Sequence, residues 1–142
     1  MKRIMGFYIF SIVLVGLAGC AADQPVVEHE DHSSVAVTRW TDKSELFMEY
    51  DELTAGRASE FITHLTVLED FSPVTEGSVT YTFSGDNGET VRETAPEPER
   101  DGIFLPSITI DTPGTYDLTL TVESTQLTDT IHVGEVHVHD SG

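Results

Sequence analysis

The sequence predicts an all-β protein, a sandwich of about seven or eight short antiparallel strands. Two features of the pattern indicate this fold class. Apolar and polar residues alternate with a period of two in several segments, so one face of each segment is available for a core. Turn sequences rich in glycine, proline, asparagine and aspartate separate these segments, and no apolar stripe at helical spacing follows the N-terminal region.

The expected strands follow one another closely along the chain. The first should span residues 35–40, the next two residues 44–50 and 60–68, and a later one residues 103–110. The clearest alternation lies in two further segments, whose apolar members are Val79, Tyr81 and Phe83 in one and Tyr116, Leu118, Leu120 and Val122 in the other. Residues 94–100 are expected to form a polar loop, because prolines interrupt them.

The last strand changes phase. Ile131 and Val133 lie in one phase of the alternation, whereas Val136 and Val138 lie in the other. Successive side chains of a strand point to opposite faces, so all four can reach one core only if an extra residue is inserted. We therefore expect a β-bulge at residues 134–135.

The segment before the second alternating strand resembles a tyrosine corner. It reads Asp-Thr-Pro-Gly-Thr-Tyr and ends at Tyr116, so a turn leads directly into a strand. In immunoglobulin-like domains such a tyrosine sits at a corner, and its hydroxyl bonds to the backbone a few residues upstream. We expect Tyr116 to be buried in this way, in an immunoglobulin-like β-sandwich. The lack of a cysteine pair excludes only the core disulfide of antibody domains.

The first nineteen residues have the order of a secretory signal peptide. Lys2 and Arg3 are followed by an uncharged, mostly apolar run over residues 4–17 and then by small residues up to Cys20. This run is shorter than the roughly 20 residues that usually cross a membrane. The alternative is an uncleaved membrane anchor.

Residues 17–20, Leu-Ala-Gly-Cys, resemble the lipobox of bacterial lipoproteins. The resemblance implies that Cys20, the only cysteine, becomes the first mature residue and carries acyl chains. Each buried methylene contributes about 0.8 kcal/mol of membrane affinity, so two or more chains make a stable anchor. Residues 20–34 would then be a lipid-anchored flexible tether, residues 35–139 the β-sandwich and residues 140–142 a C-terminal tail.

The protein is strongly acidic. Its formal charge is −18, and removal of residues 1–19 takes away two of the seven basic residues but none of the 25 acidic ones, which leaves −20. Such a surface repels nucleic acid and anionic lipid headgroups and attracts cations, so a nucleic-acid partner is excluded. Solubility alone is the alternative reason for the charge.

No catalytic motif is present, and a non-enzymatic protein is expected. The histidines are the candidate site residues. His29 and His32 lie on the tether, and His137 and His139 lie on the last strand, followed by Asp140. Residues two apart on a strand face the same side, and imidazole and carboxylate suit Zn²⁺ or Cu²⁺. These four histidines are candidate metal ligands, and ordinary solvated side chains are the alternative.

Three other residues have a structural and a functional interpretation. Met48 is expected in the core, with a thioether ligand for Cu(I) as the alternative. His64 is expected to be a hydrogen-bonded structural histidine. Trp40 is expected to be a core or edge aromatic rather than a platform for a ligand.

Four segments of the sequence, taken in order, resemble parts of one known domain. They are residues 40–50 (Trp-Thr-Asp-Lys-Ser-Glu-Leu-Phe-Met-Glu-Tyr), residues 55–66 from Ala-Gly-Arg-Ala to Phe-Ile-Thr-His-Leu-Thr, residues 71–77 (Phe-Ser-Pro-Val-Thr-Glu-Gly) and residues 102–104 (Gly-Ile-Phe). In this order they resemble the N-terminal β domain of the periplasmic adaptor (membrane fusion) subunits of heavy-metal-type RND efflux pumps. The resemblance covers about residues 35–139.

This resemblance implies an envelope module linked to heavy-metal or cation efflux, with docking surface for RND pump or adaptor components and transient metal binding. The family continues with barrel-sandwich and hairpin domains, whereas this sequence ends at Gly142. A truncated adaptor, an excised piece and a free-standing relative are all open. The alternative functions are a periplasmic copper- or zinc-binding lipoprotein and a purely structural protein-contact sandwich. Ala21 after the cysteine favours the outer membrane, whereas such adaptors act at the inner membrane.

Overall fold

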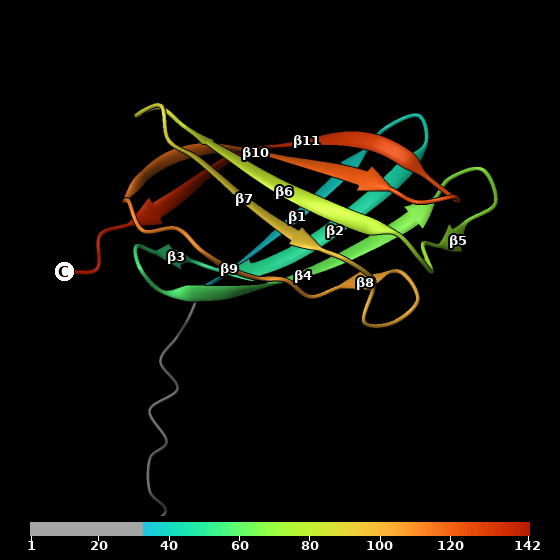
Figure 1. Cartoon of the computed structure of the whole chain (residues 1–142), viewed down its shortest axis with the longest axis horizontal. Helices are drawn as coiled ribbons and strands as arrows, with labels where there is room; N and C mark the ends of the chain where they lie inside the picture. Colours follow the sequence, from blue (N-terminus) through green and yellow to red (C-terminus); the bar gives the residue numbers. More distant parts are fainter. Residues whose placement is uncertain (1–32) are drawn as a thin grey trace, which may run out of the picture.

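The computed structural model describes residues 33–142, which form two β-sheets packed face to face (Figure 1). The predicted all-β class is confirmed. One sheet contains β1 (Ser34–Trp40), β2 (Ser44–Asp51), β4 (Ala58–Val67), β5 (Ser72–Pro73), β8 (Ile103–Phe104) and β9 (Ser107–Thr109). The other contains β3 (Leu53–Thr54), β6 (Ser78–Gly85), β7 (Thr90–Ala95), β10 (Gly114–Glu123) and β11 (Thr128–His139). We call them the β2 sheet and the β10 sheet.

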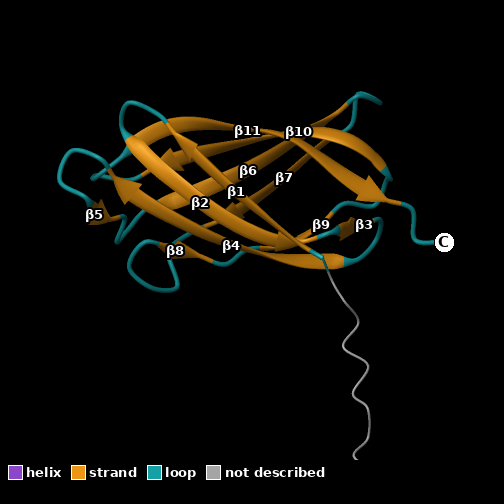
Figure 2. Ribbon diagram, turned by 180° about the vertical axis from the view of Figure 1, so that it is seen from behind, coloured by secondary structure: helices purple, strands orange, loops and turns teal. Residues whose placement is uncertain are grey.

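The strand order is β1-β2-β4-β5 in the β2 sheet, where β8 and β9 also pair with β4, and β3-β11-β10-β6-β7 in the β10 sheet. Neighbouring strands are antiparallel, except that the short β3 runs parallel to β11. Figure 1 looks onto the β10 sheet, and Figure 2 shows β1, β2 and β4 from the opposite side. Within residues 33–142 there is no helix of the length and apolar character needed to cross a membrane.

The inward side chains of both sheets meet in one core. Phe61 on β4 stacks on Tyr50 with ring centroids 4.7 Å apart, and it meets Tyr81 and Phe83 of β6 edge-on at 6.1 and 5.9 Å. The Tyr81 hydroxyl donates to the Thr63 hydroxyl over 2.7 Å, so two buried polar atoms satisfy each other across the sheets. The interior therefore couples the two sheets through aromatic contacts and one buried hydrogen bond.

Most of the expected strands are present, but residues 33–142 form eleven strands rather than about seven or eight, because four of them are pieces of only two or three residues. The strand expected at residues 103–110 is split into β8 and β9, because Pro106 lacks the N–H that a continuous ladder requires. Part of the loop expected at residues 94–100 belongs to β7, an edge strand that was missed because its residues are mostly polar and exposed. β1 begins at Ser34, one residue earlier than expected.

The tyrosine corner is confirmed. Tyr116 is fully buried, and its hydroxyl donates to the Thr112 carbonyl at 2.9 Å, four residues upstream. The same oxygen lies 3.1 Å from the carboxylate of Glu89 in the β6–β7 turn. Burial is the main reason why the pKa of Tyr116 is raised, and hydrogen bonds from the side chains of Thr112 and Tyr116 lower that of Glu89. The corner thus ties β10 to a turn of its own sheet.

The expected β-bulge in the last strand is also present. Leu118 pairs with Gly134 and Thr119 with His132, so Val133 has no partner on β10 and the bulge lies one residue before the predicted position. The extra residue brings the apolar residues on both sides into the core, as the sequence required. All four are buried: Ile131, Val133, Val136 and Val138. Gly134 takes a φ of 114°, which favours glycine.

Candidate functional site

The face of the β2 sheet that points away from the core carries two half-buried large apolar side chains near its centre. On β2, Leu46, Met48 and Tyr50 point inward and are buried, so Phe47 must point outward between them. The buried Met48 confirms its expected place in the core. The same alternation on β4 places Ile62 outward. Large apolar side chains thus occupy outward positions on two adjacent strands.

Strand pairing brings these outward residues into rows. Thr38 on β1 pairs with Phe47, Phe47 pairs with His64 on β4, and His64 pairs with Ile103 on β8. The rings of Phe47 and His64 are 5.6 Å apart at an interplanar angle of 52°. The expectation for His64 is therefore only partly right. It is a packed side chain, but it lies on the outer face, and among the described residues its ring makes no side-chain hydrogen bond.

Trp40 extends this face at the end of the edge strand β1. Its side chain is 64% exposed, and its indole Nε1 donates to a carboxylate oxygen of Glu45 over 2.7 Å. Of the two expected places, core or edge, Trp40 takes the edge. Indole is costly to leave in water, since fully burying a large apolar side chain is worth about 1.5–3 kcal/mol. Because of this exposure, Trp40 is the most accessible large apolar side chain on the face.

Carboxylates surround this apolar centre. The outward acidic side chains are Glu45, Glu49 and Asp51 on β2 and Glu60 on β4. No lysine or arginine occupies an outward position of β1, β2 or β4. The face therefore combines apolar and aromatic groups with charge of one sign.

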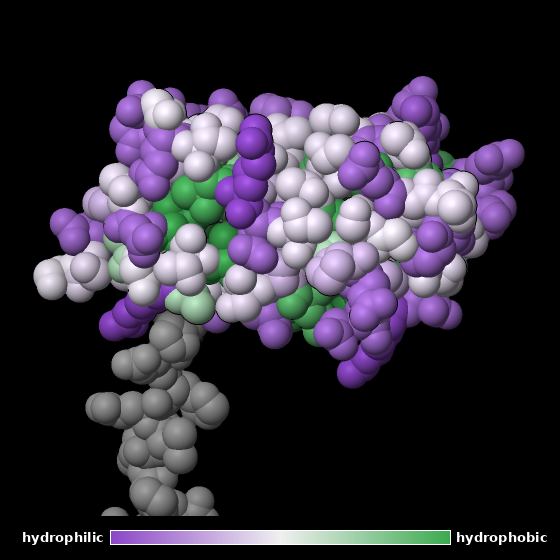
Figure 3. All heavy atoms as spheres, in the orientation of Figure 1, coloured by the Kyte–Doolittle hydropathy of each residue, from purple (hydrophilic) through white to green (hydrophobic). Residues whose placement is uncertain are grey.

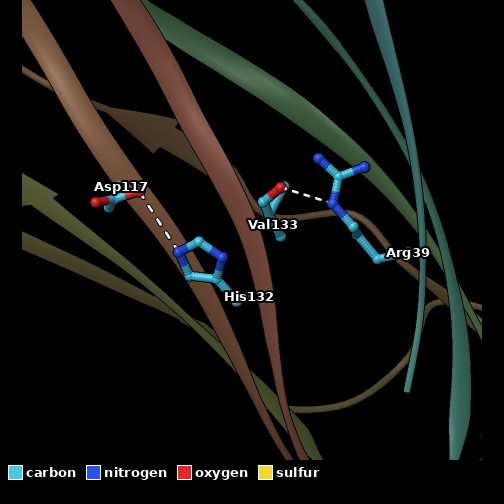
Figure 4. A network of polar contacts seen from close by, with 4 residues as sticks. All are labelled: Arg39, Asp117, His132 and Val133. Atoms are coloured by element: carbon cyan, nitrogen blue, oxygen red, sulfur yellow. Dashed lines mark hydrogen bonds and ion pairs between the residues drawn. The ribbon is translucent and has the colours of Figure 1, made fainter. Parts of the chain in front are cut away.

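Arg39 fixes β1 in place beside the bulge (Figure 4). Its Nε donates to the Val133 carbonyl over 2.8 Å and its Nη1 to the Thr38 carbonyl over 2.8 Å. Since the bulge takes Val133 out of the ladder, its carbonyl needs another donor. Arg39 therefore links an edge of the β2 sheet to β11, and its neighbour Trp40 points to the opposite side of β1. Sequence reasoning missed this contact: Arg39 lies in the inward phase of Val35 and Val37 but is exposed, and its partner is 94 residues away along the chain.

The turn after Trp40 is held by a second polar contact. Asp129 at the start of β11 accepts hydrogen bonds from the hydroxyls of Thr41 at 2.5 Å and Ser44 at 2.7 Å. Ser44 is fully buried, and its amide donates to the Thr41 hydroxyl at 3.0 Å. The position of β1 relative to the β10 sheet is thus fixed at two points, Arg39 and this turn.

A groove of about 490 Å³ lies at this end of the sandwich. It is formed where three turns meet, and its lining residues are Asp42, Lys43, Val67, Leu68, Glu69, Gln126, Leu127 and Thr128. Nearby in sequence, Phe71 is 77% exposed at a φ of 59°, the only positive φ of a non-glycine residue between residues 33 and 142. An L-residue in this region costs about 1–2 kcal/mol. Its exposure could not have been predicted, because the sequence places Phe71 beside an ordinary Ser-Pro turn.

The C-terminal histidines lie on the outer face of the β10 sheet. His137 and His139 are both exposed on β11, and the expectation that they share a face is confirmed. His137 Nδ1 lies 3.1 Å from the hydroxyl of Thr115. His132, which sequence reasoning did not single out, lies 3.5 Å from the carboxylate of Asp117 (Figure 4). Among residues 33–142 no three histidine, cysteine or acidic side chains come together as a group that could hold a metal ion.

The other predicted site residues, Cys20, His29 and His32, lie outside the described residues. Comparison of the chain with protein-family models, with curated proteins and with solved structures finds no match.

Proposed function

We propose that the protein is a non-enzymatic module of the bacterial cell envelope that works through protein contacts, as the N-terminal β domain of a heavy-metal-type RND adaptor would. The support from the sequence is the ordered resemblance over residues 35–139 and the signal segment that ends at Cys20. The two-sheet all-β fold is compatible with this role. The lipid on Cys20 would hold the module at the periplasmic side of the inner or outer membrane.

The observation that carries the proposal is the exposed Trp40 beside the outward apolar residues of the β2 sheet. Tryptophan dominates the binding energy of protein interfaces more than almost any other residue. On this face it lies in one sheet with Phe47 and Ile62, which also point away from the core. A protein partner would cover all three.

Photo-crosslinking in growing cells tests the proposal. A photoreactive amino acid is placed at Thr38, on the outer face of the β2 sheet, and separately at Thr121, on the outer face of the β10 sheet. We expect a discrete protein adduct from at least one position, identified by mass spectrometry as an efflux-pump or adaptor component. Loss of the gene should also lower the tolerance of the cells to copper or zinc. No adduct at either position, with unchanged tolerance, contradicts the proposal.

Transient metal binding is a second candidate function, favoured by the shared face of His137 and His139 on β11. Two imidazoles leave the coordination of Cu²⁺ or Zn²⁺ incomplete, so the affinity would be lower than that of closed four-ligand sites. The net charge of −18 would concentrate divalent cations near such a pair. This function is compatible with a periplasmic metal carrier as well as with an adaptor module.

A further inference from the structure

We propose that the outward face of β1, β2 and β4 is a docking surface for a basic protein segment, one that presents apolar side chains between lysines or arginines. The inference rests on the proposed function, because it names the surface that makes the protein contact and the chemistry of the partner. The surface consists of Trp40, Phe47 and Ile62 with the carboxylates Glu45, Glu49 and Glu60 around them.

The apolar side chains of the surface lie on three adjacent strands, diagonal to one another and next to polar residues. Phe47 lies between Thr38 and His64 in one row of the sheet, and in the next row Glu49 pairs with Ile62. Neighbouring strands are about 4.8 Å apart, so an extended segment laid along or across these strands can touch several of the outward side chains at once. At the end of β1, Trp40 lies opposite Glu45, to which its indole is already bonded.

The charge of the face selects the occupant. Its titratable side chains are carboxylates apart from His64, and the whole chain carries −18, so a second copy and an anionic lipid surface are both repelled. Lysine and arginine are attracted, and either can also place its cation over the face of Trp40 or Phe47. A segment with apolar and basic residues complements both the apolar side chains and the carboxylates of the surface. The carboxylates of an acidic segment would be repelled by those of the surface.

The surface is held ready for binding by contacts on its far side. Arg39 bonds to the Val133 carbonyl, and Asp129 holds the hydroxyls of Thr41 and Ser44, so both ends of the turn beside Trp40 are fixed. A preorganised face loses less conformational entropy when it binds. Trp40 makes no contribution to the buried core that would explain its place, since it is 64% exposed.

Trp40 is the only tryptophan in the chain, so its fluorescence reports directly on occupation of the surface. The purified full-length chain in a non-ionic detergent is titrated with a short peptide in which two phenylalanines alternate with two lysines, so that each face of the extended peptide presents both residue types. We expect a saturable change in the Trp40 emission. The changes Phe47→Thr and Ile62→Thr, which keep strand-forming residues, should each weaken this binding by about tenfold, as removal of a central apolar contact does. Thermal unfolding followed by circular dichroism checks that these variants remain folded.

Two comparisons separate specific docking from diffuse attraction. Glu49→Gln with Glu60→Gln removes two charges from the proposed surface, and Glu123→Gln with Glu135→Gln removes two from the other sheet. Only the first pair should weaken binding. A peptide with serine in place of phenylalanine, and one with glutamate in place of lysine, should both bind poorly.

Several outcomes overturn the inference. Equal losses for the two glutamine pairs, or equal binding of the serine peptide, would mean that net charge alone attracts the peptide. A dimer in sedimentation that Phe47→Thr dissociates would make a second copy the occupant, and equally strong binding to anionic vesicles would make it a membrane. If crosslinks in cells arise only from Thr121, the proposed function stands while this surface is wrong.

Discussion

The outer faces of the two sheets cover the same core but differ in chemistry. The outer face of the β10 sheet carries threonines, histidines and charges of both signs, with Arg92 paired to Thr82 and Thr82 to Thr119. Seen from this side, most of the surface is white or purple, with smaller green areas left of the centre and near the lower edge (Figure 3). The outer face of the β2 sheet has Phe47 and Ile62 at its centre and carboxylates around them.

This difference distinguishes the outward side chains that folding requires from those that it does not require. Alternation in a sandwich requires apolar residues only on the inward face of each strand, and threonine on the outward face meets the strand preference without adding apolar surface. The β10 sheet follows this rule. The β2 sheet departs from it at the half-buried Phe47 and Ile62 and at the exposed Trp40, the three apolar residues of the proposed docking surface.

The largest expected effect concerns the core that both faces share. Tyr116→Ala should lower the free energy of unfolding by about 3–5 kcal/mol, because it removes a buried aromatic ring. Tyr116→Phe keeps the ring and loses the hydrogen bond to the Thr112 carbonyl, so it should cost about 1 kcal/mol. Urea unfolding measures both. A cost below about 1 kcal/mol for the alanine variant would mean that the stability of the two sheets does not depend on Tyr116.

The link between the sheets should have the next largest effect. Arg39→Met keeps a long apolar side chain but leaves the Val133 carbonyl without its charged donor, so we expect a loss of about 1.5–3 kcal/mol. Arg92→Met on the edge strand β7 is the control and should change the stability by less than about 0.5 kcal/mol. Similar losses for the two variants in urea unfolding would show that the Arg39 contact is of no special importance.

The stability that Glu76 gives to the end of the sandwich, which belongs to neither outer face, should depend on pH. The carboxylate of Glu76 accepts hydrogen bonds from the Thr125 amide at 2.6 Å and its hydroxyl at 2.8 Å, and these bonds lower the pKa of Glu76. A lowered folded-state pKa gives stability that is present above the unfolded value of about 4.3 and is lost as pH falls through the folded value.

Glu76→Gln should therefore be less stable than the wild type at neutral pH, and the difference should shrink at about pH 3. Urea midpoints at both pH values measure the effect. Glu135→Gln, whose carboxylate accepts no hydrogen bond within the described residues, is the control and should show no such convergence. A difference for Glu76→Gln that stays the same at both pH values would exclude the proposed titration.

The smallest effect should be metal binding at the outer face of the β10 sheet. Calorimetry with Cu²⁺ or Zn²⁺ in about 0.15 M salt, where charges are screened beyond about 8 Å, should show weak binding that His137→Ala with His139→Ala reduces. His29→Ala with His32→Ala tests the tether pair in the same way. Binding should weaken in acid, because imidazole must be neutral to coordinate. His64→Ala, on the β2 sheet, is the control. Identical heats for all variants would leave the histidines as solvated side chains.

The sequence by itself determined the fold class and much of its detail. The alternation placed Met48, Tyr81 and Leu118 in the core, and the phase change in the last strand required the bulge. The segment before Tyr116 was sufficient to predict its burial and a bond to nearby upstream backbone, and the structure identifies the acceptor as the Thr112 carbonyl. These features depend on residues close together in the chain, where strand periodicity and turn geometry act directly.

Only the tertiary structure decided which distant residues meet. The apolar face combines residues from β1, β2 and β4, and its extent depends on the strand order and register that bring Thr38, Phe47 and His64 into one row. The bond between Arg39 and Val133 joins residues 94 positions apart, and the polar edge strand β7 is held by pairing with β6 rather than by an apolar pattern of its own. Alternation predicts that a side chain points outward, but it does not predict which side chains lie beside it. Neighbours across a sheet are set by the pairing between strands, which the local pattern does not specify.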